Sequence, residues 1–249
     1  MPSPLIQQDN SQSWWQVIRT EIRFLTFRAT REELAQLGTK HLIFGILCTW
    51  LVGIGRYWDN PRVGLLQHLG TGSVIYLFVF SLLLWLVLWP LRPKGCSYFK
   101  VLTFVSMVSP PALLYAIPVE HFFSIDTANT INVWFLAIVA TWRVALLIFF
   151  LKRYGQMNPF VIIIATLLPL TFIVLSLTIL NLEKVVFNIM GGIHERSAAD
   201  SSYVVLLLLS YGSIMLFVPV VIGYVALSIL SLLQARKARQ ITNDGTHHQ

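Results

Sequence analysis

Long stretches without a charged side chain dominate this sequence and are separated by short polar segments. They cover residues 41–55, 63–91, 101–119, 127–151 with a single arginine inside, 154–182 and 201–235. A helix that crosses a hydrocarbon core about 30 Å thick needs roughly 20 apolar residues. Regular alternation of polar and apolar positions, the pattern of strands in outer-membrane barrels, is absent from these runs. The pattern predicts an all-α fold, a polytopic transmembrane helical bundle of about six spans.

The first and last runs depart from the ideal length. The first has 15 residues, which extend only about 22 Å as a helix, so we expect Lys40 and Arg56 to reach toward the two interfaces. The last has 35 residues with Pro219 near its middle. We expect one tilted helix kinked at this proline, because two spans would leave too few residues for a turn.

The basic residues predict how the chain threads through the membrane. With the N-terminus in the cytoplasm, 13 of the 18 basic residues lie on the inner side, four lie outside and Arg143 lies within a span. Such an excess follows the positive-inside rule. The inner residues are Arg19, Arg23, Arg28, Arg31, Lys40, Arg92, Lys94, Lys100, Lys152, Arg153, Arg236, Lys237 and Arg239. We therefore expect a multi-pass protein of a bacterial-type plasma (inner) membrane with both termini cytoplasmic.

Composition agrees with this picture and narrows the partners. The chain is 56% hydrophobic and 12% charged with a mean hydropathy of +0.70, which leaves too little polar surface for a water-soluble globule. The net charge of +7 is used mainly for topology and for attraction to anionic lipid headgroups. We expect a lipid bilayer and other membrane proteins or further copies of this chain as partners, and no nucleic acid.

The region before the first span is predicted to be helical and amphipathic. One helical face collects apolar side chains and another side carries basic ones, and the helix could lie in the membrane interface or pack on the cytoplasmic end of the bundle. Thr30 and Glu33 form the pattern of a capping box, so a second helix should begin at Thr30 and end near Gly38. The apolar face consists of Trp14, Ile18, Ile22 and Leu25, with Arg19 and Arg23 elsewhere. The resulting regions are a cytoplasmic amphipathic region at 1–39, a six-span domain at 40–235 and a basic, polar tail at 236–249.

Arg143 is the one charged residue inside a predicted span. It lies nine residues before Lys152, or about 13 Å from the cytoplasmic end of its helix. An arginine at that depth costs about 2.5 to 3.5 kcal/mol on insertion scales, so it must find partners or reach water. Three interpretations are open: binding to carbonyl groups of another span, extension toward the cytoplasm, and a direct role in handling a substrate or proton.

Pro110 and Pro111 mark the span most suited to bind this arginine. Prolines cannot donate backbone hydrogen bonds, so they free carbonyl groups near Ser106 and Met107 at a similar depth. We expect the guanidinium to bind these carbonyls, with the Ser109 hydroxyl assisting, and so to join two spans. The candidate intramembrane polar cluster is Arg143, Ser106, Ser109, Pro110 and Pro111.

Motifs for catalysis or cofactor binding are missing from the sequence. There is no HExxH zinc pattern, no GxSxG elbow, no Walker loop and no histidine pair at helical spacing within a span. Cys48 and Cys96 are the only cysteines, so no disulfide framework is expected. We expect no enzymatic activity, no cofactor and no metal.

The segment KVLTFVSMVSPPALLYAIP, with Pro110 and Pro111 near its centre, resembles the proline-bearing third span of Yip1-type membrane domains. That family also places a polar N-terminal region in the cytoplasm before a compact helical bundle, although its usual five helices differ from the six expected here. The resemblance implies a membrane scaffold or trafficking-type protein that acts through partners, with no catalytic residues to carry over.

Two kinds of function follow from these observations. The first is a non-enzymatic multispanning protein that acts as a scaffold, assembly or accessory factor. The alternative is a small transporter or channel with a polar cavity around Arg143 and the proline-broken spans, which include Pro169 and Pro219. An intramembrane enzyme is a third option. Whether these polar groups border water or pack against protein distinguishes the first two.

Overall fold

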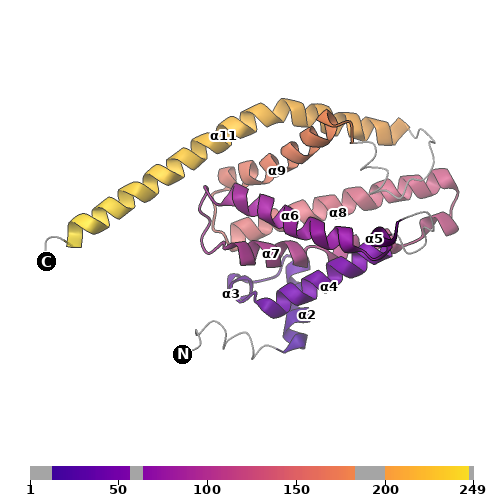
Figure 1. Cartoon of the computed structure of the whole chain (residues 1–249), viewed down its shortest axis with the longest axis horizontal. Helices are drawn as coiled ribbons and strands as arrows, with labels where there is room; N and C mark the ends of the chain where they lie inside the picture. The colour runs from indigo at the N-terminus through magenta and orange to yellow at the C-terminus, as the bar shows by residue number, and fades with distance from the viewer. Residues whose placement is uncertain (1–12, 57–63, 183–199, 247–249) are drawn as a thin grey trace.

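The computed structural model describes residues 13–56, 64–182 and 200–246, and it contains no strand within them. The elements are α2 (Trp14–Leu25), α3 (Arg31–Ala35), α4 (Thr39–Gly55), α5 (Leu65–His68), α6 (Thr71–Leu88), α7 (Tyr98–Met107), η1 (Pro110–Ala116), η2 (Val119–His121), α8 (Ile125–Arg153), α9 (Pro159–Ile179) and α11 (Asp200–Thr246). Figure 1 shows the longer helices running side by side as a bundle, with α2 lying across them and α11 extending beyond. The expected all-α helical bundle is confirmed.

Within the described part of the chain, five helical segments are long and apolar enough to cross a membrane. They are Thr71–Leu88, Tyr98–Ala116, Thr130–Arg153, Pro159–Ile179 and Leu207–Ala235. The sixth expected span corresponds to α4, which is apolar but has only 17 residues. The sequence also identified this first span as the shortest, because Lys40 and Arg56 limit its uncharged run to 15 residues.

The core of the bundle surrounds α7. Half of the Tyr98–Ala116 span is buried, a larger share than in any other described span. The Phe104 ring stacks on Phe150 of α8 with centroids 4.3 Å apart, and Phe24 of α2 meets the same Phe104 ring edge-on at 5.8 Å. Helix α7 therefore lies at the centre, with α4, α6 and α8 packed around its length.

One end of the bundle gathers cations from several elements and is called the basic end below. It combines α3, the start of α4, the connector between α6 and α7, and the end of α8. Lys100 donates from Nζ to the carbonyls of Ala35, at 2.6 Å, and Leu37. The Tyr154 hydroxyl donates to the Gly95 carbonyl at 2.8 Å. These bonds fix the short connecting segments against one another.

Gly95 shows why one of these connectors needs glycine. Its φ of +70° lies in the left-handed region, and an added Cβ would come within 2.8 Å of the Tyr154 hydroxyl. A side chain at this position would therefore strain the backbone and displace the tyrosine.

Helix α2 packs on the bundle through a face that the sequence did not indicate. Its buried residues are Val17, Glu21 and Phe24, whereas the expected apolar residues Trp14 and Ile22 are exposed. The side chains at 17, 21 and 24 follow helical spacing and form one stripe. The helix packs on the bundle, but at a different place from the cytoplasmic end considered in the sequence analysis.

The end of α2 meets α8 well inside that helix. Trp142 donates from its indole N–H to the Leu25 carbonyl at 3.1 Å, and its ring lies 6.0 Å from that of Phe27. Trp142 is 11 residues before Arg153, or about 16 Å along α8. Helix α2 therefore crosses the side of the bundle rather than capping its end.

The predicted capping box is confirmed. The Thr30 side chain accepts from the Glu33 amide, and the Glu33 carboxylate accepts from the Thr30 amide at 2.7 Å. Glu33 also pairs with Arg23 of α2 at 3.0 Å. The helix ends at Ala35, earlier than expected, because Gly38 is the N-cap of α4.

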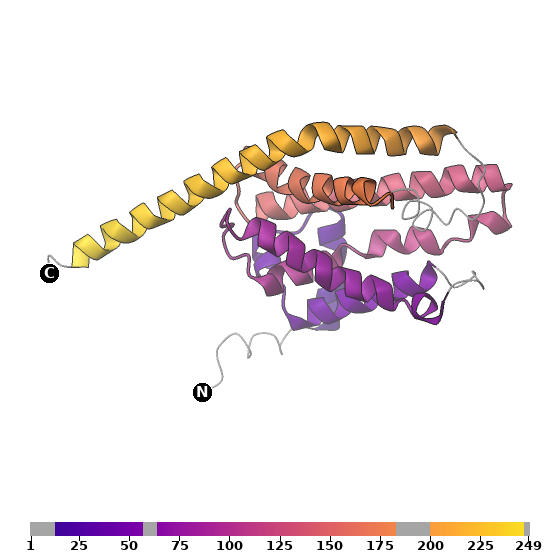
Figure 2. The same ribbon diagram turned by 45° about the horizontal axis from the view of Figure 1, so that its top comes forward.

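Helix α11 is continuous from Asp200 to Thr246 and contains Pro219 in its interior. This confirms one helix rather than two spans, and the predicted tail begins as its continuation. Figures 1 and 2 both show α11 packed along α9 and then projecting past the bundle. The Thr178 hydroxyl donates to Ser210 at 3.2 Å, and the Tyr224 hydroxyl donates to the Val87 carbonyl at 3.0 Å. Residues 183–199, which precede this helix, lie outside the described residues.

Candidate functional site

The two prolines after α7 change the helical hydrogen bonding from the α to the 3-10 pattern. Helix α7 ends at Met107, and η1 begins at Pro110. The Ser109 amide donates to the Ser106 carbonyl at 3.3 Å, and the Ala112 amide donates to the Ser109 carbonyl at 2.9 Å. In an α-helix the Ala112 amide would bind the Val108 carbonyl instead. The tighter turn thus leaves the Val108 carbonyl available.

Arg143 donates from Nε to this Val108 carbonyl at 3.4 Å. The expected contact between Arg143 and the proline break is therefore present, but at Val108 rather than at Ser106 or Met107. The Ser106 carbonyl is used by the Ser109 amide, which explains the shift. The bond is long for an N–H···O interaction, so it contributes modestly to the joining of α8 to α7.

The two serines of the candidate cluster bind other partners. The Ser106 hydroxyl donates to the Thr103 carbonyl at 2.8 Å. The Ser109 hydroxyl lies 2.6 Å from the Thr49 hydroxyl, which itself donates to the Gly45 carbonyl at 2.8 Å. Because the single Thr49 proton is used there, Ser109 is the donor between them. Ser109 thus joins α7 to α4 and does not assist Arg143.

Thr49 and Gly45, like Val108, are members of this junction that sequence reasoning missed. An added Cβ at Gly45 would lie 2.2 Å from the Ser106 Oγ and 2.8 Å from the Ser106 carbonyl carbon. Small residues let membrane helices approach closely enough for such contacts. A glycine and a threonine one turn apart in the first span were the available signal. The polar junction below means Gly45, Thr49, Ser106, Val108, Ser109 and Arg143.

Three polar side chains of the junction are packed against protein, whereas Arg143 is only partly buried. Ser106, Ser109 and Thr49 are buried, and their hydroxyls are all hydrogen-bonded within the bundle. Farther along α4, the Arg56 guanidinium lies 4.8 Å from the centre of the Tyr115 ring, a cation–π contact between α4 and η1. These interactions hold the broken span in place from two sides.

Arg143→Met tests the contribution of the arginine to this junction. The substitution keeps an unbranched apolar side chain that reaches as far as the Nε position but removes every donor, so the Val108 carbonyl loses its partner in a low-dielectric interior. We expect a loss of about 1 to 2 kcal/mol in stability and faster amide exchange across η1, measured by thermal unfolding and hydrogen exchange in lipid nanodiscs. Unchanged exchange in η1 would show that the bond does not hold the break.

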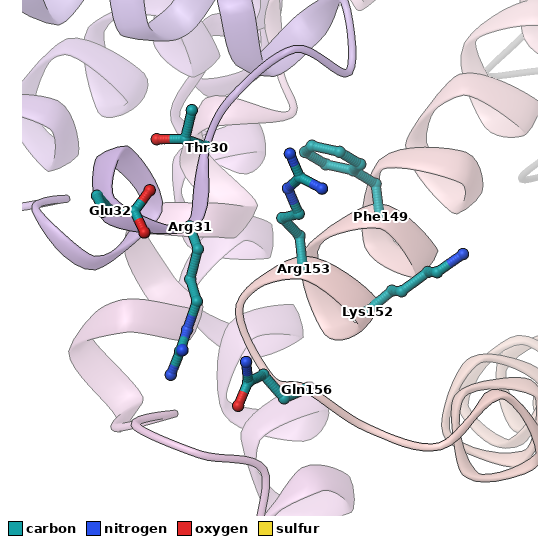
Figure 3. A pocket seen from close by; sticks show the side chains of 7 residues that line it. All are labelled: Thr30, Arg31, Glu32, Phe149, Lys152, Arg153 and Gln156. Atoms are coloured by element: carbon teal, nitrogen blue, oxygen red, sulfur yellow. The ribbon is translucent and has the colours of Figure 1, made fainter.

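A second polar feature is an open pocket of about 620 Å³ at the basic end. Three of its lining residues are cations from two elements, and we call it the cationic pocket. In Figure 3 the Arg31 side chain of α3 points toward Gln156, the Arg153 side chain of α8 points the opposite way beside the Phe149 ring, and Lys152 extends away from Arg31. The lining residues are Thr30, Arg31, Glu32, Phe149, Lys152, Arg153 and Gln156.

Glu32 is the carboxylate of the cationic pocket. A hydrogen bond from its own backbone amide and one from the Thr30 side chain lower its carboxyl pKa, with smaller contributions from Arg31 and Arg153. It is therefore ionised at neutral pH. Sequence reasoning used the pocket cations only as a topology signal, because no spacing in the chain indicates that residues 31 and 153 meet.

Groups of three or more metal-binding side chains are absent from the described part of the chain. Cys48 and Cys96 are both free thiols, as expected.

The fold and these features define a polytopic α-helical integral membrane protein. Comparison of the chain with protein-family models gave no match, and neither did comparison with curated proteins or with solved structures. The assignment of function therefore depends on the chain's own geometry.

Proposed function

We propose that this protein is a non-catalytic membrane protein that acts through partner proteins, as a scaffold, assembly or accessory factor. The distribution of basic residues favours a bacterial-type plasma membrane with both termini in the cytoplasm. The likeness of the proline-bearing span to Yip1-type domains fits a role of this kind. The observation that carries the proposal is the exposed apolar surface of α11.

The membrane span of α11 contacts the bundle on one side only. Just 6% of its residues are buried in the protein. Eight of its 13 exposed large apolar residues recur at alternating intervals of three and four, which places these eight along one stripe of the helix. They are Leu208, Tyr211, Met215, Val218, Ile222, Val225, Ile229 and Leu232. Such a stripe has the spacing with which one helix packs along another.

The polar junction supports this proposal over a transporter or channel. Arg143 binds Val108, Ser109 binds Thr49, and Gly45 brings α4 against α7. These contacts use the polar groups at the proline break to join helices. A solute pathway would need such groups to face water.

Site-specific photocrosslinking in native membranes tests the proposal. A photoreactive amino acid at Met215 or Ile222 should give a discrete crosslinked protein band, either with another protein or with a second copy. Ile75 and Val79 on α6 are matched controls, because their exposures of 63% and 62% resemble the 77% and 64% of the α11 positions. The controls should label lipid only. Lipid labelling alone at all four positions would contradict a partner on α11.

Cysteine accessibility supplies the result that would favour the alternative. Single cysteines at Ser106, Thr166 and Ser213, in a chain with Cys48 and Cys96 replaced, should resist a small water-soluble thiol reagent because all three positions are buried. Rapid labelling at all three would indicate a water-filled cavity, and with it a transporter or channel.

A further inference from the structure

The cationic pocket contains more positive charge than helix termination requires. Lys152 and Arg153 stand in the last turn of α8, where cations stabilise the helix dipole and need no other explanation. Arg31 comes from a different element and adds a third positive charge to the same opening. Glu32 is the one acidic residue in the lining. The pocket thus has a formal charge of about +2 at neutral pH.

The pocket is built on braced elements. Helix α3 is fixed by its capping box and by the bonds from Lys100 to the Ala35 and Leu37 carbonyls. Phe149, the aromatic residue of the lining, contacts the rings of Phe27 at 5.8 Å and Phe24 at 6.4 Å. Helix α3 and the Phe149 ring are therefore held in place without a ligand.

The position of the pocket matches the boundary between headgroups and acyl chains. The α8 span ends at Arg153, and Phe149 lies four residues earlier, about 6 Å deeper along the helix. Cations at the end of a span lie at the depth of a charged lipid headgroup, and an apolar ring one turn deeper lies at the depth of the acyl chain. A cavity of about 620 Å³ exceeds what a phosphate group needs and leaves room for a glycerol backbone.

We propose that the cationic pocket binds the phosphate of an anionic membrane lipid: the exposed Arg31 and Arg153 side chains turn toward each other to hold the phosphate, and Phe149 contacts the first methylenes of an acyl chain. Guanidinium groups bind phosphate oxygens through paired N–H donors. Lys152 adds positive charge to the pocket. Glu32 repels the anionic phosphate and so limits the affinity of the pocket for it. This inference does not depend on a partner at α11.

Lipid titration of the purified full-length protein, followed by native mass spectrometry, tests the site. The probes are dioleoyl phosphatidylglycerol, dioleoyl phosphatidylcholine and glycerol 3-phosphate. We expect one phosphatidylglycerol to bind at least about tenfold more tightly than phosphatidylcholine. Each cation near a charged headgroup contributes about fivefold in affinity. The variant Arg31→Gln/Lys152→Gln/Arg153→Gln should therefore bind phosphatidylglycerol at least about tenfold more weakly.

The matched control removes three exposed cations outside the pocket. Arg19→Gln/Arg92→Gln/Lys237→Gln changes the net charge by the same amount and should alter the affinity by less than about twofold. Glu32→Gln removes the opposing charge and should tighten binding about threefold, a gain that misfolding does not produce. The single variant Arg31→Gln serves if the triple variant is unstable, and should lose about fivefold.

Three results would overturn the proposal. Equal losses in the two triple variants would mean attraction to overall surface charge. Equal affinity for the two lipids would mean that no anionic selectivity exists. Displacement of phosphatidylglycerol by glycerol 3-phosphate at matching concentrations would mean a site for soluble phosphate compounds, in which the acyl chain plays no part.

Discussion

Gly45→Val is expected to prevent α4 and α7 from packing and to lower stability by about 3 kcal/mol or more. Even a single Cβ at position 45 would lie 2.2 Å from the Ser106 Oγ and 2.8 Å from the Ser106 carbonyl carbon. The second of these atoms belongs to the backbone, so a rotamer change cannot relieve the collision. The measurement is thermal unfolding in nanodiscs, with the yield of monodisperse protein as a second readout.

Gly212→Val in α11 is the matched control for this substitution. An added Cβ there meets no atom within 4 Å, so the same change should cost little. The double variant Gly45→Ala/Ser106→Gly should recover part of the stability lost in Gly45→Ala, because it removes the nearer of the two colliding groups. Equal stability of the variants at positions 45 and 212 would show that the close approach of α4 to α7 is not required.

Glu21→Gln is expected to strengthen the docking of α2 on the bundle and to remove most of its pH dependence. The Glu21 carboxyl is 3% exposed, and neither of its oxygens has a hydrogen-bond partner among the described residues. Burial raises its pKa from 4.5 to about 8. The docked helix therefore holds this carboxyl protonated at neutral pH, whereas the undocked helix exposes it and lets it ionise.

The direction of the pH effect follows from this difference. Docking is strongest below about pH 4.5, weakens as the pH rises toward about 8, and changes little above that value. From low pH to above pH 8, docking loses on the order of 5 kcal/mol of free energy. About 3 kcal/mol of this loss is already present at pH 7. Limited trypsin cleavage at Arg19 and Arg23 should therefore become faster between pH 6 and about 8, after correction for the enzyme's own pH profile.

The Gln variant should show a flat cleavage profile over the same range. Glu32→Gln is the control, because the Glu32 carboxyl has a lowered pKa and so contributes no slope there. An unchanged slope in Glu21→Gln would assign the pH dependence to another group.

The positions of the spans could be predicted from sequence because hydrocarbon imposes the requirement directly. The uncharged runs coincide with observed helices or groups of helical segments, and the shortest run gives the short apolar helix α4 of 17 residues. The capping box at Thr30 and Glu33 was equally predictable, since its hydrogen bonds join residues three positions apart. Both are properties of local sequence.

The polar junction was predictable only in part. The prolines indicated that a carbonyl would be free and that Arg143 would need one. The carbonyl that Arg143 binds depended on the change to 3-10 geometry. In that geometry the Ser106 carbonyl accepts from the Ser109 amide, and the Val108 carbonyl is left for Arg143. The bond between Ser109 and Thr49 joins residues 60 positions apart, so no local pattern contains it.

The face of α2 shows a further limit of pattern reading. Hydrophobicity alone favoured Trp14 and Ile22 as the packed residues, whereas the bundle covers Val17, Glu21 and Phe24. An isolated glutamate between apolar positions gives no sign that it will be buried. The Leu25 and Phe27 contacts with Trp142, which fix the helix in this orientation, come from a residue more than 100 positions away.

The uninterrupted course of α11 has a mechanical consequence. From Pro219 to Thr246 the helix measures about 40 Å, with its base held against α9 and its far end beyond the bundle. A rotation of about 10° at the base would move the far end by about 7 Å. A rod of this kind converts a small sideways change within the bilayer into a displacement in the adjoining water, without any rearrangement along its own length.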